Sequence, residues 1–127
     1  MEAGHRGLGT MLDGPARPTA VFAANDLIAI GMLKRLREAG ARVPRDLSIV
    51  GFNDIPLAGL LEPALTTVRV PQLEMGVVGA HLLIDRLEGR PIDDVRVTLS
   101  TELLVRASTA APDTTQASPP TPTGAQP

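Results

Sequence analysis

Residues 19–52, TAVFAANDLIAIGMLKRLREAGARVPRDLSIVGF, decide the fold of this chain. Residues 19–24 form a short apolar run without charge, which predicts a strand buried on both faces of a parallel sheet. Residues 47–52 repeat this pattern, and a segment with helical periodicity, 27–39, lies between the two runs. The stretch therefore predicts a β-α-β unit with parallel strands and a right-handed crossover.

Signals for the start and the end of a helix flank residues 27–39. Asn25 or Asp26 can cap the N-terminus with a side-chain oxygen, and Gly40 stands where helices commonly end in a left-handed residue. The helix has one apolar face, away from its charged residues, and that face comprises Ile28, Met32, Leu36 and Ala39.

Five further regular elements are predicted from similar patterns: a helix over 2–12, a strand over 66–70, a helix over 72–88 and two strands over 95–100 and 102–106. Residues 53–65 are expected to be irregular because Pro56 and Pro63 interrupt them. This order of elements predicts the α/β class, with an incomplete doubly wound parallel sheet.

The composition excludes several classes of function. The 127 residues include 12 basic and 14 acidic side chains, so the net charge of −2 gives no electrostatic footprint for DNA or an anionic membrane. With no Cys and two His, we expect no metal, no cofactor and no thiol chemistry. No apolar stretch is long enough to span a bilayer and the N-terminus lacks a signal core, so a soluble cytoplasmic chain is expected.

The C-terminal residues 109–127 differ in composition from the rest of the chain. They contain five Pro and five Thr and no apolar side chain larger than Ala. Such a segment cannot offset the entropy of ordering, so it is predicted to be a disordered tail. Residues 1–108 are left for the fold.

Small polar side chains follow both strands of the β-α-β unit. Asn25 and Asp26 come after the first strand, and Asn53 and Asp54 after the second. Because ligands of open α/β sheets bind beyond the carboxyl ends of the strands, we expect Asn25 and Asn53 within side-chain reach of each other, offering amides to a polyhydroxylated or nitrogenous ligand. The alternatives are that Asn25 only caps the helix and that Asn53 is a turn residue. Asp26 and Asp54 are expected to stabilise their local turns.

Four motifs at fixed spacings resemble one protein family. They are AAND at 23–26, PRDLSIVGFND at 44–54, PALTTV at 63–68 and TELLVR at 101–106. In this order they are similar to the C-terminal half of the lactose-repressor (LacI/GalR) family of bacterial transcription regulators. The resemblance covers about residues 4–109.

The resemblance implies the C-terminal part of a type I periplasmic-binding-protein-like fold, a two-lobed effector sensor. In that family the sensor follows a DNA-binding helix-turn-helix, which this chain lacks. By analogy residues 1–69 and 99–106 belong to the C-terminal lobe, and 71–98 pack on the N-terminal lobe. The helix over 72–88 would then have no packing partner in the isolated chain. We therefore expect marginal stability, with partial disorder beyond residue 70, self-association through this helix, or aggregation.

The resemblance also assigns roles to residues. Asn25 matches a position whose amide contacts the effector, and Asn53 stands where many members have an effector-binding Asp. An Asn at this position donates as well as accepts, so the preferred effector is expected to differ by one hydrogen bond. A dimer interface is implied at Leu27, Ile30, Leu57 and Leu61, while the alternative for the loop leucines is a satellite core.

The implied function is binding and not catalysis. The intact regulator would be a homodimer that binds a small metabolite, expected to be a sugar, in its interlobe cleft and thereby changes the DNA affinity of its linked heads. An alternative is a fragment of a sugar-binding solute-binding protein of a transport system, which shares the fold. An enzyme is disfavoured because Asp26 and Asp54 are the only catalytic candidates at these strand ends.

Overall fold

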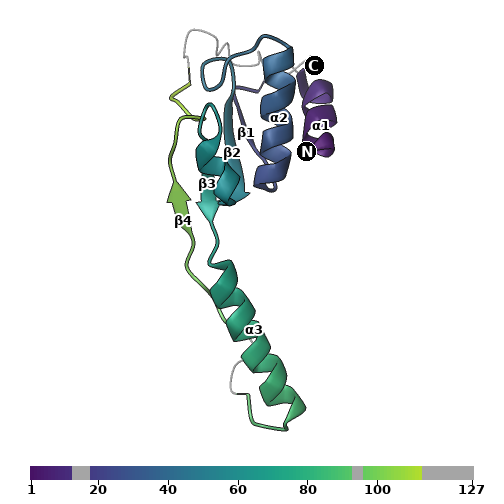
Figure 1. The fold of residues 1–127 in the computed structure, drawn as a ribbon, viewed down its shortest axis with the longest axis vertical. Helices are drawn as coiled ribbons and strands as arrows, with labels where there is room; N and C mark the ends of the chain where they lie inside the picture. The colour runs from purple at the N-terminus through teal and green to yellow at the C-terminus, as the bar shows by residue number, and fades with distance from the viewer. Residues whose placement is uncertain (13–17, 93–95, 113–127) are drawn as a thin grey trace, which may run out of the picture.

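The computed structural model describes residues 1–12, 18–92 and 96–112. In chain order its elements are α1 (Glu2–Leu12), β1 (Ala20–Phe22), α2 (Asp26–Glu38), β2 (Ser48–Asn53), the 3-10 helix η1 (Pro56–Leu60), β3 (Thr66–Arg69), α3 (Gln72–Leu87) and β4 (Glu102–Leu104). The strands form one sheet in the order β1-β2-β3-β4, in which the first three are parallel and β4 is antiparallel to β3 (Figure 1). The predicted α/β class and the parallel β-α-β unit are confirmed.

Helix α2 begins and ends at the predicted signals. Asn25 is the N-cap, and its Oδ1 accepts a hydrogen bond from the Ile28 backbone N–H at 2.9 Å. Gly40, just past the end, has φ +70°, the left-handed conformation that glycine adopts without steric cost. Between these ends the helix turns its apolar face toward β2, with Ala29 and Leu36 buried.

The hydrophobic core is aliphatic and lies around α2 and β2. It contains Leu8 of α1, Met32 and Leu36 of α2, and Ile49 of β2, with Leu65 at the start of β3. Burying each large side chain of this kind contributes about 1.5–3 kcal/mol.

The C-terminal segment after β4 also belongs to this core. Ser108 is fully buried, and its hydroxyl donates to the Ile49 carbonyl at 2.6 Å and accepts from the Thr66 N–H at 2.8 Å. Beyond it the Thr109 and Thr66 hydroxyls pair at 3.0 Å, and the Ala110 N–H donates to the Ser48 hydroxyl. Residues 109 and 110 therefore continue the packed chain, whereas most of the predicted tail, 113–127, lies outside the described residues.

Strand β1 is not buried on both faces, so that prediction is wrong. Among the described strands it is the terminal one of the sheet, and its neighbour is β2. Phe22 is 61% exposed and makes an edge-to-face contact with Phe52, at 6.4 Å between ring centroids. The apolar run predicted a strand correctly but carried no information about its position in the sheet.

Two other sequence expectations are wrong. Residues 53–65 are not irregular throughout, because Pro56 occupies the first position of η1, where a helix needs no N–H donor. The strand predicted over 95–100 is absent from residues 96–100, and residue 95 lies outside the described residues. The only strand described in this part of the chain is β4, which pairs with β3.

Helices α1 and α2 contact each other through glycines. A Cβ added to Gly4 would lie 2.1 Å from the Ile28 carbonyl oxygen, and one added to Gly31 would lie 1.9 Å from the Met1 carbonyl oxygen. The two backbones therefore touch, and Leu8 on α1 is fully buried as a result.

We expect Gly31→Ala to displace α1 from α2, because its methyl group overlaps the Met1 backbone. Partial loss of the Leu8 contacts should lower the free energy of unfolding by roughly 1–3 kcal/mol. Urea unfolding and amide exchange over residues 2–12 measure the two effects. Gly7→Ala is the matched control: no atom lies within 4 Å of its added Cβ, and the exchange of glycine for alanine in an exposed helix stabilises by roughly 0.5–1 kcal/mol. If both variants were stabilised, the close helix contact would be wrong.

Helix α3 extends away from the core (Figure 1). None of its residues is buried, and Leu73 and Leu87 are 84% and 76% exposed. The helix is joined to the core by the chain leaving β3 and by the chain returning to β4. As predicted, the 72–88 helix has no buried residue against the described part of the chain, while its effects on stability and self-association stay predictions. No described helix meets the length and apolarity needed to cross a membrane.

Candidate functional site

Asn25 and Asn53 lie at the same edge of the sheet. Asn25 follows the carboxyl end of β1, and Asn53 is the last residue of β2. Because β1 and β2 are parallel neighbours, their carboxyl ends share one edge. Both side chains are half-buried. The reach between their amides stays a prediction.

The Asn25 carboxamide is oriented by its role as a helix cap. Its Oδ1 faces the Ile28 N–H, and no described residue accepts a hydrogen bond from its Nδ2. The group is planar, so an oxygen fixed toward the helix turns the amino group to the other side. Capping is therefore compatible with ligand contact, because the two roles use different atoms of one side chain.

Asn53 and the residue after it have unusual backbone conformations. Asn53 has φ +109° and Asp54 has φ +54°, both in the region that favours glycine. Asn and Asp tolerate positive φ better than other non-glycine residues do, but each such residue still costs about 1–3 kcal/mol, which the surrounding contacts must offset. The chain thus turns sharply out of β2 at the residue predicted to meet the ligand.

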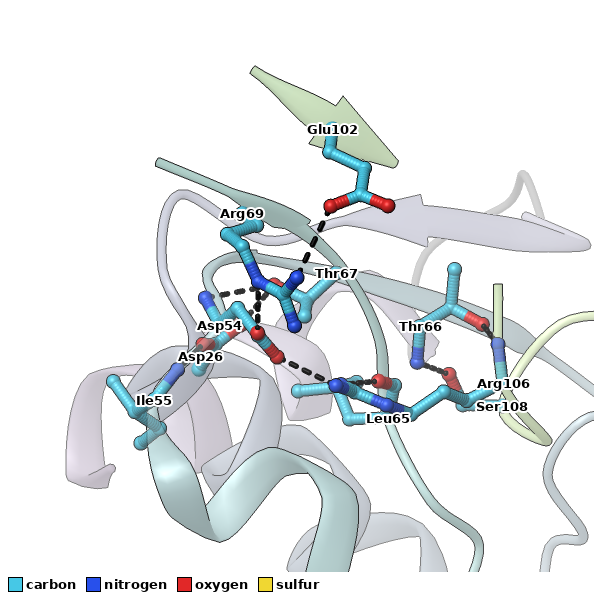
Figure 2. Close-up of polar contacts among 10 residues, drawn as sticks. All are labelled: Asp26, Asp54, Ile55, Leu65, Thr66, Thr67, Arg69, Glu102, Arg106 and Ser108. Atoms are coloured by element: carbon cyan, nitrogen blue, oxygen red, sulfur yellow. Dashed lines mark hydrogen bonds and ion pairs between the residues drawn. The ribbon is translucent and has the colours of Figure 1, made fainter. Parts of the chain in front are cut away.

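Asp26 is fully buried and holds three elements together (Figure 2). Its Oδ1 accepts from the Thr67 hydroxyl of β3 at 2.6 Å, and its Oδ2 accepts from the Ile55 backbone N–H at 2.8 Å. As the first residue of α2 it also places negative charge at the positive end of the helix dipole. Asp26 was expected to stabilise its local turn, and its side chain also binds partners from β3 and the loop after β2.

Gly51 of β2 makes room for the Asp26 carboxylate. A Cβ at this position would lie 2.2 Å from Asp26 Oδ1 and 2.9 Å from a methyl carbon of Leu65. The strand therefore needs a residue without a side chain where it passes the buried carboxylate.

Asp54 pairs with two arginines, as Figure 2 shows. Its Oδ1 accepts from Arg106 Nη2 at 2.6 Å and its Oδ2 accepts from Arg69 Nε at 2.9 Å. Desolvation acts to raise the pKa of the Asp54 carboxyl, but the hydrogen bonds from Arg106 and Arg69 outweigh it and hold this pKa below its ordinary value. The prediction that Asp54 bonds mainly to its own loop is wrong.

The hydrogen bonds of the two carboxylates favour binding over acid–base chemistry at this edge. Both carboxylates at this edge are engaged as hydrogen-bond acceptors, Asp26 by a hydroxyl and an N–H and Asp54 by two guanidinium groups. Among the described residues no group of three or more His, Asp or Glu side chains is placed to hold a metal ion. The donors left at the edge are the amides of Asn25 and Asn53.

Sequence reasoning missed the side chains that support this edge. Thr67, Arg69 and Arg106 were not singled out, although Thr67 and Arg106 stand within the PALTTV and TELLVR motifs. The distance along the chain is the reason: Thr67 is 41 residues from Asp26, and Arg106 is 52 residues from Asp54. The pairing of β2 with β3 brings Thr67 to Asp26, and the pairing of β3 with β4 brings Arg106 to Asp54.

The four predicted interface residues differ in exposure. Leu27 and Leu57 are 48% and 46% exposed, whereas Ile30 and Leu61 are half-buried. Leu61 also packs against the core cluster, which fits the alternative of a satellite core for that residue. The interface itself stays a prediction.

Comparisons with known proteins agree with this geometry. A family model described as the periplasmic binding protein-like domain matches residues 2–109. The lactose operon repressor of Rhizobium radiobacter is 43% identical over 111 residues, which are 87% of this chain and 97% of that protein. The chain spans about a third of the length of other curated repressors that it matches.

Two solved structures show the same likeness in three dimensions. The transcriptional regulator CelR in complex with cellobiose has 40% identity and a TM-score of 0.78, over 84% of this chain and 33% of that one. A LacI family regulator from Arthrobacter sp. FB24 in complex with lactose has 35% identity and a TM-score of 0.72, over 86% and 41%. These relatives are transcriptional regulators and not enzymes, which agrees with a binding edge and favours a regulator over a transport protein. The chain belongs to the LacI family of transcriptional regulators and forms part of their periplasmic-binding-protein-like effector-binding domain.

Proposed function

We propose that Asn25 and Asn53 bind an uncharged sugar effector at the carboxyl edge of the sheet. The observation that carries this proposal is the orientation of the Asn25 carboxamide, whose oxygen is used by α2 and whose amino group has no acceptor among the described residues. Asn53 adds a second amide at a point where the backbone itself is turned out of the strand. Two amides at one edge suit hydroxyl groups, which both donate and accept hydrogen bonds.

The charges around this edge favour a neutral ligand. Arg69 and Arg106 both pair with Asp54, and Arg69 also pairs with Glu102 at 3.1 Å. An anionic effector would have to compete with these carboxylates for the guanidinium groups. A sugar needs no such exchange, and cellobiose and lactose are the ligands in the two solved relatives.

In the whole regulator this contact would serve to control DNA binding. A ligand shifts an equilibrium between two arrangements only if it binds one of them better, so sugar held between two lobes would favour one lobe orientation. We propose that the regulator acts as a homodimer through Leu27, Ile30, Leu57 and Leu61, and contacts DNA through a helix-turn-helix outside the residues of this chain.

The substitution Asn25→Asp separates ligand contact from helix capping. Asp caps as well as Asn, so the free energy of unfolding should change by less than about 0.5 kcal/mol. Asp has no amide donor, so binding should weaken about tenfold, the equivalent of roughly 1.4 kcal/mol for one lost hydrogen bond. The measurement is a nuclear magnetic resonance titration of the 127-residue chain with cellobiose and with lactose. Millimolar sugar concentrations are used, because this chain supplies only part of the contacts of the sugar site and binding is expected to be weak.

Two controls make this test specific. Asn25→Ala removes both the cap and the donor, so it should weaken binding and also cost about 1 kcal/mol of stability. Glu62→Gln changes an exposed carboxylate away from the site and should alter neither sugar binding nor stability. Equal binding by the parent chain and by Asn25→Asp, or sugar-induced resonance shifts that avoid Asn25 and Asn53, would reject the proposed site.

A further inference from the structure

The Asp54 carboxylate binds the end of β3, from which the chain leaves for α3, and the segment that follows β4. Arg69, which it binds through Oδ2, is the last residue of β3, two residues before the Pro71 cap of α3. Arg69 in turn binds Glu102, the first residue of β4 and its partner in the strand register. Asp54 Oδ1 binds Arg106, which follows β4. One carboxylate thus binds the end of β3 directly, reaches the start of β4 through Arg69, and binds the chain beyond β4 through Arg106 (Figure 2).

The direction of α3 depends on these two segments. The helix has no buried residue, so packing against the core does not fix its orientation. Its direction then depends on the paired ends of β3 and β4 from which the chain runs to and from α3, which we call the root (Figure 1). At the root Arg69 lies opposite Glu102. A change in this pair would swing the whole helix, because a small rotation at the root is carried along its length.

The same carboxylate is covalently next to the proposed ligand contact. Asn53 and Asp54 are consecutive residues with positive φ, so a shift of the Asn53 backbone reaches Asp54 over one peptide unit. Asn53 is also the register partner of Arg69 in the β2–β3 ladder. A ligand bound to the side-chain amide of Asn53 would therefore affect the position of the Asp54 carboxylate over a single peptide unit.

The two arginines hold Asp54 with unequal firmness. The Arg106 side chain is 22% exposed and also donates to the Leu65 carbonyl at 2.8 Å. Arg69 is 52% exposed and Glu102 is 62% exposed, so their contacts compete with water and are weak individually. Arg69 is therefore the contact that can open while Arg106 stays in place.

We propose that Asp54 is a positioning residue that couples effector contact at Asn53 to the direction in which α3 leaves the core. This inference rests on the proposed sugar site. With sugar bound, the Asn53 peptide is held and Asp54 keeps both arginines, so the β3–β4 root and α3 have one direction. Without sugar, the Arg69 contact opens part of the time and α3 samples a wider range of directions.

The test measures the direction of α3 in the full 127-residue chain. Because the chain has no Cys, His81→Cys on α3 and Arg45→Cys on the core, both at exposed positions, give two unique sites for nitroxide labels. Electron–electron double resonance then gives the distribution of distances between the labels, with and without cellobiose and with and without lactose. In the labelled parent we expect sugar to narrow this distribution.

Two variants and one control decide the proposal. Asp54→Asn should widen the sugar-free distribution and abolish the sugar-induced narrowing, and Glu102→Gln, at an exposed position where folding is not at risk, should do the same to a smaller extent. Asp85→Asn breaks a comparable exposed pair with Arg90 at the far end of α3 and should behave as the parent. If the role of Asp54 were merely structural, Asp54→Asn would lower the stability of the chain. Glu102→Gln would then show the same distance distribution and the same response to sugar as the parent. That result would overturn the coupling.

A failure of the sugar site is recognised separately. If cellobiose and lactose leave the Asn25 and Asn53 resonances of the parent chain unmoved, the proposed function fails. The coupling is then tested on the sugar-free chain. There Glu102→Gln should shift the backbone resonance of Asn53, to which it is linked through Arg69 and Asp54. An unmoved Asn53 resonance in this variant would reject the link between the root and the site.

Discussion

Replacement of Asp26 by Ala is expected to lower the free energy of unfolding by roughly 3–5 kcal/mol, because one buried donor and one half-buried donor lose their acceptor at once. The Thr67 hydroxyl and the Ile55 N–H both end on this carboxylate. Each donor left unsatisfied costs about 1–3 kcal/mol, and α2 loses a favourable charge at its N-terminus. A loss of this size is a large part of the total stability of a small domain, about 5–15 kcal/mol.

Urea unfolding followed by circular dichroism measures this loss. Thr67→Val removes one donor together with its need for an acceptor, so the double variant Asp26→Ala, Thr67→Val should lose less than the sum of the two single changes. Glu62→Ala, at an exposed position, should stay within about 0.5 kcal/mol of the parent. Strict additivity in the double variant would contradict the buried hydrogen bond between Asp26 and Thr67.

The second large effect is expected for Gly51→Ala. Its methyl group would overlap Asp26 Oδ1 and crowd Leu65, and both neighbours are fully buried. The carboxylate cannot retreat without breaking its two hydrogen bonds, so the cost should reach or exceed the roughly 1–3 kcal/mol typical of overpacking.

Gly51→Ala should also change the sugar edge, because a displaced Asp26 no longer holds the Ile55 N–H and the loop that follows Asn53. We expect shifts in the Asn53 and Ile55 amide resonances that exceed those in the Gly7→Ala control. A variant with parental stability and parental resonances would show that Gly51 does not accommodate Asp26.

The β-α-β unit could be predicted because its signals are local. The cap at Asn25 and the stop at Gly40 act within four residues of their partners, and the apolar runs of β1 and β2 are continuous in sequence. The common edge of Asn25 and Asn53 then follows from parallel pairing alone.

The supporting side chains could not be predicted because they depend on register between distant strands. Nothing in the spacing of Asp54 and Arg106 indicates that Arg106 follows a strand antiparallel to β3. The exposure of Phe22 likewise depends on the position of β1 in the sheet, and an apolar run does not indicate that position. Both errors concern tertiary arrangement. The 3-10 helix η1 and the strand expected over 95–100 are separate errors in secondary structure.

The exposure of α3 also affects the thermodynamic quantities that calorimetry and denaturant unfolding of the chain would give. The heat capacity of unfolding and the denaturant m-value both scale with newly exposed surface, and α3 has little left to expose. Both quantities should therefore match those of a protein shorter than this one. At 16 residues, α3 is close to the length at which an isolated helix is only marginally stable, so its ellipticity should decay gradually and ahead of the cooperative heat absorption by the core. A single melting temperature from circular dichroism would then mix two processes with different enthalpies.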